Sequence, residues 1–179
     1  MSDECERQRR LFFALWPDEG VRIALARIAR ALPRRRGRLV PASNLHMTAV
    51  FVGATDSRTC DSLQARAGDI DAREFFLTLT HIGYFSRSRI LWLGADECPA
   101  ALTDLVRQLN TCLTVCALTP ELRPFRPHVT LRRDAAPLST DLRVPPVKWS
   151  VHSFCLMASE TRPEGARYEI LRQFALQRY

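Results

Sequence analysis

The chain has 179 residues, of which 46% are hydrophobic and 25% are charged. This length suits one domain with a substantial core, and the hydrophobic share excludes an intrinsically disordered chain. No apolar run approaches the roughly 20 residues that a membrane-spanning helix requires, so we expect a cytoplasmic protein without a membrane partner. The net charge is +7, and arginine supplies all but one of the 26 basic residues. Arginine binds phosphate well, which suggests an RNA partner, although a GC-rich genome would also favour arginine over lysine.

The first half of the chain is expected to alternate between strands and amphipathic helices. The expected elements are strands over 11–16 and 45–53 and helices over 21–32 and 60–70. The first strand is an aromatic, apolar run, and Asp18 is suited to cap the helix that follows it. Pro33 and the arginine-rich segment 34–38 end that helix in a loop. This loop precedes the next strand and could guide a nucleic acid toward it.

The second half is expected to be richer in strands. The expected elements are strands over 75–79, 90–93, 128–131, 149–157 and 168–176 and a helix over 99–116. Apolar and threonine side chains alternate over 75–80, as in a half-buried strand, and 90–93 should pair with it as a hairpin. Residues 134–147 are interpreted as an irregular loop. Because helices and strands mix without strict alternation, we expect a single α+β domain over residues 1–179 with antiparallel sheets.

Two short segments of the same form carry the chemistry. His46-Met47-Thr48 and His128-Val129-Thr130 each place a histidine and a threonine two residues apart around an apolar residue. In a strand, residues i and i+2 project from the same face, so each segment presents an imidazole beside a hydroxyl. The histidines are 82 positions apart, close to half the chain. The repeat predicts two similar lobes that face each other across a central cleft.

Two histidines and two threonines are suited to hydrolysis of a phosphodiester. One histidine would take a proton from water and the other would protonate the leaving oxygen, because the ordinary pKa of histidine is close to ~6.5. Thr48 and Thr130 would donate hydrogen bonds to the phosphoryl oxygens. No cofactor and no metal ion is needed. Strand alternation would place Arg132 on the same face as His128, with Arg133 pointing away unless the strand twists or bulges.

The sequence resembles the 2H phosphoesterases, specifically the RNA 2′,3′-cyclic phosphodiesterases, also called LigT-like or 2′-5′ RNA ligase proteins. The segments that carry the resemblance are 10–17, 40–48, 51–53, 90–94 and 125–133, and the turn and strand around 165–168 also fit. The resemblance implies a bilobal fold with pseudo-two-fold symmetry, two antiparallel sheets flanked by helices and a central cleft. It implies metal-independent action on RNA ends or nucleotides with a 2′,3′-cyclic phosphate, leaving a 2′-phosphate. It also places the phosphate-binding arginine at Arg133 rather than Arg132.

The resulting hypothesis gives His128 the role of base and His46 the role of acid, although the two motifs are nearly equivalent. The nucleobase could stack on one of four aromatic residues, Phe13, Phe51, Trp92 or Phe125. Core packing accounts better for the first three, which sit in apolar strands. For Phe125 stacking and core packing account equally well, because it lies in a polar, proline-rich segment beside His128. The remaining histidines, His81 and His152, lack a partner threonine and are interpreted as ordinary sheet residues.

Other functions remain open at this stage. The same fold and chemistry would serve a 2′-5′ RNA ligase or a phosphodiesterase for small cyclic nucleotides. A non-catalytic RNA-binding module would use only the basic surface, and a metal hydrolase would need carboxylates that do not cluster near either motif. The six cysteines have no zinc or disulfide spacing; Cys112 and Cys116, one helical turn apart, are expected to pack as small apolar residues. We expect a monomer without an obligate protein partner.

Overall fold

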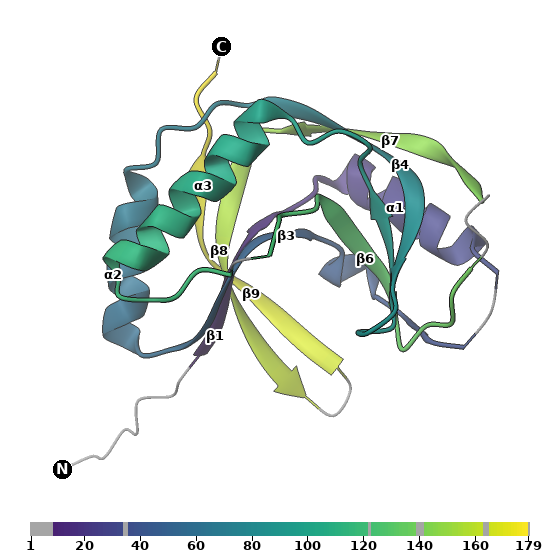
Figure 1. The fold of residues 1–179 in the computed structure, drawn as a ribbon, viewed down its shortest axis with the longest axis horizontal. Coiled ribbons are helices and arrows are strands. Elements are labelled where there is room, and N and C mark those ends of the chain that lie inside the picture. Colours follow the sequence, from purple (N-terminus) through teal and green to yellow (C-terminus); the bar gives the residue numbers. More distant parts are fainter. Residues whose placement is uncertain (1–8, 34–35, 122, 139–141, 163–164, 179) are drawn as a thin grey trace.

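The computed structural model describes residues 9–33, 36–121, 123–138, 142–162 and 165–178. It contains two antiparallel sheets (Figure 1). The first sheet, in the order β3-β1-β8-β9, comprises β1 (Arg9–Leu15), β3 (Met47–Thr55), β8 (Ser153–Arg162) and β9 (Gly165–Ala175). The second sheet, in the order β2-β6-β5-β4-β7, comprises β2 (Arg38–Leu39), β4 (Phe75–Phe85), β5 (Ile90–Gly94), β6 (His128–Arg133) and β7 (Arg143–Val151).

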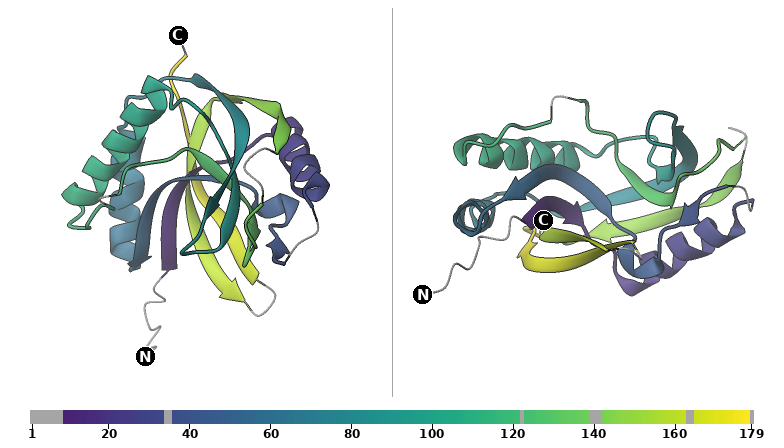
Figure 2. Two further views of the ribbon diagram at one scale, coloured as in Figure 1. Left: turned by 45° about the vertical axis from the view of Figure 1, so that its right-hand side comes forward. Right: turned by 90° about the horizontal axis from the view of Figure 1, so that it is seen from below.

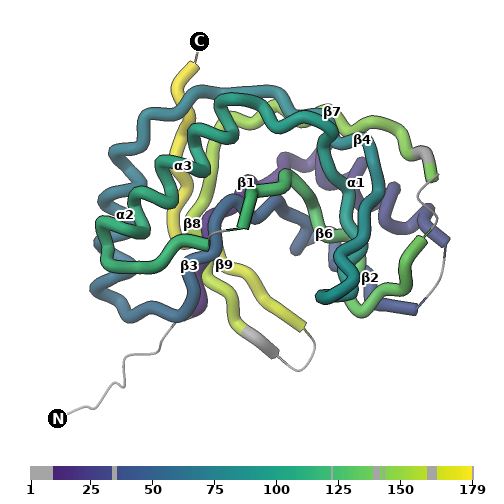
Figure 3. Tube along the Cα trace, in the orientation of Figure 1, coloured from purple at the N-terminus to yellow at the C-terminus, as the bar shows by residue number. Residues whose placement is uncertain are grey.

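In the described ranges, three α-helices flank the sheets, and a short 3-10 helix precedes β3. These are α1 (Glu19–Ala31), α2 (Ser57–Gly68), α3 (Ala100–Val115) and the 3-10 helix η1 (Ala42–Asn44). Helices α2 and α3 lie side by side at one end of the molecule and contact β9 and β3, whereas α1 lies at the other end against β6 and β7 (Figures 1 and 2). The chain trace arches between these two groups of helices, and the β8–β9 hairpin extends away from the arch (Figure 3). The expected α+β, bilobal architecture is confirmed.

Local sequence signals explain where the helices begin. The carboxylate of Asp18 accepts a hydrogen bond from the backbone N–H of Val21 at 2.8 Å, as expected for a cap of α1. Asp56 caps α2 in the same way, accepting from the N–H of Thr59 at 2.7 Å. Helix α3 begins directly after Pro99. Each cap satisfies an N–H group that has no partner within the helix, which stabilises the helix by about 1 kcal/mol.

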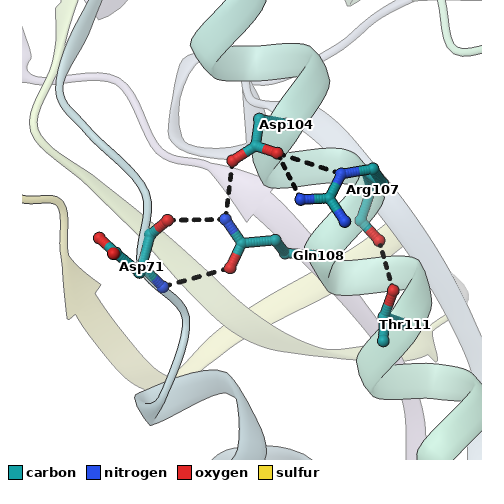
Figure 4. Close-up of polar contacts among 5 residues, drawn as sticks. All are labelled: Asp71, Asp104, Arg107, Gln108 and Thr111. Atoms are coloured by element: carbon teal, nitrogen blue, oxygen red, sulfur yellow. Dashed lines mark hydrogen bonds and ion pairs between the residues drawn. The ribbon is translucent and has the colours of Figure 1, made fainter.

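A polar network fixes α3 against the segment that leads into β4 (Figure 4). The side-chain amide of Gln108 donates to the backbone oxygen of Asp71 at 2.6 Å and accepts from its N–H at 3.2 Å. The same amide nitrogen donates to Asp104 at 2.8 Å, and Arg107 donates to the other oxygen of Asp104 at 2.6 Å. Gln108 therefore pairs with the backbone as a neighbouring strand would, which holds the start of β4 in place.

Strand β1 is apolar on both faces. Leu11, Phe13 and Leu15 belong to the main core, whereas Phe12 and Ala14 lie in a separate cluster with residues of β8. This double burial explains why the run 11–16 is entirely apolar instead of alternating. The second cluster marks the face of the sheet on which the candidate site lies.

Two sequence predictions for the second sheet are wrong in part. Strand β5 pairs with the second half of β4, from His81 to Phe85, and not with 75–79. The residues from Phe75 to Leu79 pair instead with β7. The turn between them is short, because β4 continues to Phe85 and leaves only four residues before β5.

The predictions around β7 are also wrong in part. The expected loop at 134–147 contains the start of β7, including Pro145 and Pro146. Prolines are tolerated there because β7 is the edge strand of its sheet, where a missing N–H breaks no ladder on the open side. The expected strand 149–157 is interrupted at His152, where the chain passes from the second sheet to the first. None of the helices in the described ranges is long and apolar enough to cross a membrane.

Candidate active site

The first motif lies at the start of β3. His46 directly precedes the strand, and Thr48 is its second residue. The Nδ1 atom of His46 lies 2.7 Å from the backbone oxygen of Asn44, the last residue of η1, and Nε2 lies 3.2 Å from the hydroxyl of Thr48. Since a carbonyl only accepts hydrogen bonds, Nδ1 carries the proton and donates to it. The Nε2 atom of His46 is therefore the basic nitrogen, beside the Thr48 hydroxyl.

The second motif repeats this arrangement on the other sheet. His128 is the first residue of β6, and its Nδ1 lies 2.7 Å from the backbone oxygen of Arg126. Both rings thus donate a hydrogen bond from Nδ1 to the carbonyl two residues earlier in the chain. In both, Nε2 is the nitrogen that can accept a proton. Thr130 follows at the same spacing as Thr48 follows His46. The equivalence that the sequence repeat predicts extends to the Nδ1 hydrogen bonds of the two rings.

Aromatic rings surround His46. Its ring centroid lies 5.1 Å from that of Phe12, 5.8 Å from Trp16 in a stacked arrangement, and 4.9 Å from Tyr168 edge-on. These residues come from β1, the segment after it, and β9. Sequence reasoning did not assign any of them to the site. The available signal was the run 11–16, whose aromatic residues fall on both faces of the strand.

His128 lies on a second aromatic surface. Its ring is 5.0 Å from that of Phe85 and 5.8 Å from that of Trp92. The indole of Trp92 lies flat over Gly83 and Gly94, because a Cβ atom added to them would come within 2.0 Å and 2.4 Å of the ring. Glycine at these two strand positions makes room for the indole. Trp92 is only 9% exposed, and its ring packs at a tilt against that of His128.

Burial lowers the pKa values of both histidines, and nearby charges lower that of His46 further. The pKa of His46 falls from 6.5 to about 4, mainly because burial removes water from the ring. The hydrogen bond to Asn44 opposes this shift, and the positive charges of Arg133 and His128 add to it. Burial also lowers the pKa of His128, against the hydrogen bond to Arg126. His46 therefore lies within electrostatic reach of groups on the opposite sheet, and both rings are neutral at pH 7.

A bulge in β6 separates the two neighbouring arginines. Along β5 the pairing advances one residue, from Trp92 to Leu91, while along β6 it advances two, from Thr130 to Arg132. Arg132 is buried, only 4% exposed, and donates to the backbone oxygen of Pro33 at 3.0 Å. Arg133 is exposed and is the arginine whose charge acts on His46. The bulge thus leaves Arg132 buried and Arg133 exposed, and the phosphate-binding role that the family resemblance gives to Arg133 stays a prediction.

The four aromatic candidates for base stacking lie in different environments. Phe13 is fully buried in the main core, and Trp92 lies under His128. Phe125 is half-buried against the core and lines a groove along α3. Phe51 is 61% exposed and pairs with Phe12 on the strand that carries Thr48. A second bulge, between the partners of Phe13 and Ala14, places Thr48 and Phe51 on one face.

The other histidines and the cysteines lie apart from the repeated motif. His81 pairs with Asp96 at 2.8 Å, and His152 pairs with Glu74 at 3.0 Å. Cys112 is buried on α3 and Cys116 ends this helix, and neither forms a disulfide. Within the described residues, no group of three or more histidine, cysteine, aspartate or glutamate side chains is arranged to hold a metal ion.

Two antiparallel sheets, each presenting one His-x-Thr segment toward the other, define a two-histidine phosphoesterase. The family model described as the 2′-5′ RNA ligase superfamily matches residues 17–163, and the chain belongs to this superfamily. An RNA 2′,3′-cyclic phosphodiesterase of Escherichia coli strain K12 is 36% identical over 171 residues, which cover 94% of this chain and 97% of the relative. A protein of the same name from Thermus thermophilus is 31% identical over 182 residues, covering 93% and 90%.

Solved structures agree with this assignment. The crystal structure of E. coli LigT in its apo form matches with a TM-score of 0.85 at 34% identity and covers 95% of this chain and 98% of that one. The same protein complexed with 3′-AMP matches with a TM-score of 0.85 and covers 96% and 99%. The resemblance seen in the sequence is therefore confirmed at the level of family and fold.

Proposed function

We propose that the protein is an RNA 2′,3′-cyclic phosphodiesterase that hydrolyses the cyclic phosphate to a 2′-phosphate without a metal ion. The observation that carries this proposal is the pair of histidines on opposite sheets, each with Nδ1 bonded to a carbonyl and Nε2 left for proton transfer. This arrangement supplies a base and an acid on two sides of one phosphate. The names of the E. coli and T. thermophilus relatives support the same substrate class.

In the proposed reaction the cyclic phosphate lies between the two motifs. Nε2 of His128 takes a proton from water, whose oxygen attacks phosphorus in line with the bond to O3′. As that bond breaks, Nε2 of His46 gives its proton to O3′, and the phosphate remains on O2′. The charges balance because one histidine gains a proton and the other loses one. Thr48, Thr130 and Arg133 hold the non-bridging oxygens as charge builds on them.

The acid must carry a proton, although the pKa of His46 in the free protein is about 4. The bound phosphate is negatively charged and offsets the positive charge of Arg133, so substrate binding raises the pKa of His46. The hydroxyl of Thr48 lies 3.2 Å from Nε2 of His46, the nitrogen that would carry this proton. Assignment of His128 as base and His46 as acid is our hypothesis, since the Nδ1 hydrogen bonds of the two rings are alike. In the reverse direction the roles would exchange.

For the nucleobase, exposure favours Phe51 over Phe125. Phe51 offers an open ring on the same strand face as Thr48, whereas Phe125 is partly covered by the core. Stacking of one base on an aromatic ring contributes about 1–3 kcal/mol. The base-stacking role expected for Phe125 stays a prediction, and replacing each residue by alanine and comparing KM for cyclic mononucleotides distinguishes them.

The proposal is tested with an RNA that ends in a 2′,3′-cyclic phosphate, incubated with the protein in EDTA. We expect hydrolysis, with the phosphate mapped to the 2′ position. A 3′-phosphate would contradict the regiochemistry, and loss of activity in EDTA would favour a metal hydrolase. Joining of the ends instead of hydrolysis would identify a 2′-5′ ligase, and binding without reaction would identify an RNA-binding module. The variant lacking both histidines, His46→Ala with His128→Ala, controls for contaminating nucleases.

We also propose that residues 1–179 form one bilobal domain that acts as a monomer in the cytoplasm. Residues of both sheets and all three α-helices contribute to the main core, which supports a single folding unit. Light scattering on the purified protein tests the monomer, and fractionation of the source cell tests the location.

A further inference from the structure

Three segments far apart in the sequence meet at the end of β6. Arg38 of β2 pairs with Arg133 in the β2–β6 ladder. The next residue, Asp134, accepts from Arg38 at 3.0 Å through one oxygen and from Arg89 at 3.1 Å through the other. The backbone joins the same segments, because the N–H of Ala135 donates to the oxygen of Arg89 at 2.9 Å.

Arg36 and Gly37, directly before β2, are held equally closely. The N–H of Ala136 donates to the backbone oxygen of Arg36 at 3.2 Å. Gly37 has φ of +123°, and a Cβ atom there would come within 2.8 Å of the backbone of Arg133 and Ala135. Only glycine permits this conformation and this approach. The positions of the arginines around Asp134 are therefore set by backbone contacts, not by side chains alone.

We call the exposed arginines of these segments the arginine rim. They are Arg36, Arg38, Arg87, Arg89 and Arg133. Within the described segments 36–39, 86–90 and 131–136, Asp134 is the only acidic residue, and both of its oxygens already accept from rim arginines. The side chains of Arg38 and Arg89 remain 74% and 52% exposed. The rim therefore carries a surplus of positive charge that faces water.

The groove along α3 provides a contrast. It is also lined by two arginines, Arg107 and Arg123, but each forms an ion pair with an acid of its own, Asp104 and Glu121 respectively. One-to-one pairing cancels most of the attraction for a polyanion. Of these two surfaces, only the rim has more positive than negative side chains and can therefore attract a polyanion.

The rim also begins beside the second motif. Arg133 lies on β6, the strand of His128 and Thr130, and its charge acts on His46, so this end of the rim lies next to the proposed position of the reacting phosphate. From there the rim continues outward through Arg38 on β2 to Arg89, which ends the β4–β5 turn. A cyclic mononucleotide would meet only its first member, Arg133, whereas an RNA strand carries further phosphates beyond the terminal nucleotide.

We propose that the arginine rim binds the backbone phosphates of the nucleotides that precede the cyclic end, so that the RNA leaves the site over β2 and the β4–β5 turn. This inference rests on the proposed function and adds the direction in which the substrate lies. Guanidinium groups bind phosphate oxygens in a bidentate manner, and each contact releases counterions. The rim would favour RNA ends over free cyclic nucleotides without reading the base sequence.

The test compares an RNA oligonucleotide with a 2′,3′-cyclic end and a 2′,3′-cyclic mononucleotide over a range of salt concentrations. The test variant is Arg36→Glu with Arg87→Glu, which spares Asp134, its two partners and Arg133. We expect kcat/KM for the RNA to fall at least ~10-fold more than for the mononucleotide. The slope of log kcat/KM against log salt for the RNA should become shallower by about 0.7 for each phosphate that the variant no longer binds.

A matched control carries the same change in charge elsewhere. Arg58→Glu with Arg66→Glu replaces two exposed arginines of α2, at the other end of the molecule (Figure 3). If the two double variants lose the same activity on RNA and keep the same salt slope, the rim is rejected. Fluorescence anisotropy with an RNA ending in a 2′-phosphate measures RNA affinity independently of turnover. Equal affinities for wild type and the rim variant would also reject the proposal that the rim binds RNA. Failure of wild type to hydrolyse either substrate would instead overturn the proposed function.

Discussion

The two histidines owe their equivalence to the backbone carbonyl that each one faces. Asn44 and Arg126 supply these carbonyls from the residue two positions before each ring, at 2.7 Å in both cases. A bond of this kind fixes the tautomer and the direction of the ring before substrate arrives, so less reorganisation is needed during the reaction. The sequence His-x-Thr shows the partner threonine but does not reveal the carbonyl, which depends on the turn before each strand.

Removal of either ring should abolish proton transfer on one side of the phosphate. We expect His46→Ala and His128→Ala each to lower kcat on a cyclic mononucleotide by about 10²–10⁴-fold, the usual contribution of a general acid or base. His152→Ala, at the exposed turn between β7 and β8, is the matched control and should keep full activity. Thermal unfolding of each variant shows whether the fold is intact. Near-normal kcat in either motif variant would exclude that histidine from the reaction.

The electrostatic contact between the sheets can be measured on His46 itself. Its pKa in the free protein should be about 4, and Arg133→Gln should raise it, because the guanidinium charge is one cause of the low value. Addition of a 2′-nucleotide should raise it as well, since the phosphate offsets that charge. NMR titration of the imidazole signals measures all three. A pKa near the ordinary value of ~6.5 in the free protein would contradict the burial of His46.

Arg133 illustrates what the sequence could predict about the site and what it could not. Both histidines and both threonines follow from the motif, because spacing of two in a strand has one structural meaning. The choice between Arg132 and Arg133 depends on an extra residue in β6, and a bulge has no reliable signal in a single sequence. Simple alternation favoured Arg132, which is buried against Pro33, and only the family resemblance indicated Arg133.

Asp134 should act on the reaction through Arg133. Its carboxylate joins Arg38 and Arg89 directly after Arg133, so its loss should loosen the end of β6. We expect Asp134→Ala to lower kcat/KM on a cyclic mononucleotide about 10-fold in the wild-type background and to have no further effect in Arg133→Ala. A double-mutant cycle measures this coupling. Independent, additive losses would show that Asp134 does not position Arg133.

At the level of elements, sequence patterns predicted the helices well and the strands less well. Helices α1 and α3 follow from their apolar spacing together with Asp18 or Pro99 at the start, signals that lie within the helix itself. The partners of β4 could not be predicted, because β4 pairs with β7 along its first half and with β5 along its second half. Pairing of this kind is decided by contacts between residues distant in sequence.

The packing of Trp92 on β5 against Gly83 on β4 can be tested directly. A Cβ atom at Gly83 would lie 2.0 Å from the indole, so Gly83→Ala must displace the ring from beneath His128. We expect a loss of about 1–3 kcal/mol in the free energy of unfolding, as for other overpacked sites, together with lower activity. Urea denaturation and kcat measure the two effects.

The control for this substitution is Gly68→Ala at the end of α2. There the nearest atom to the added Cβ lies at 3.7 Å, an ordinary contact. Alanine is also the better helix former, so this variant should be as stable as wild type or slightly more stable. If both alanine variants behave alike, Trp92 does not depend on the space above Gly83.

At the scale of the whole molecule, the two sheets hold His46 in a place that favours its neutral form, which links stability to pH. The pKa of His46 is about 4 in the folded protein and 6.5 in its ordinary state, so the unfolded chain binds more protons between these values. The contribution of His46 to the free energy of unfolding is therefore fully present above pH 6.5 and is lost as the pH falls toward 4. His128, whose pKa is also lowered, contributes in the same direction.

We expect wild type to lose about 2 kcal/mol of unfolding free energy between pH 7.5 and pH 5 through His46. Urea denaturation at the two pH values measures this loss. His46→Gln, which keeps a similar volume but does not titrate, should lose correspondingly less. Asp56 and Asp104 do not interfere, because hydrogen bonds lower their pKa values further below 3.8. An equal loss of unfolding free energy in wild type and His46→Gln would show that burial between the two sheets does not lower the pKa of His46.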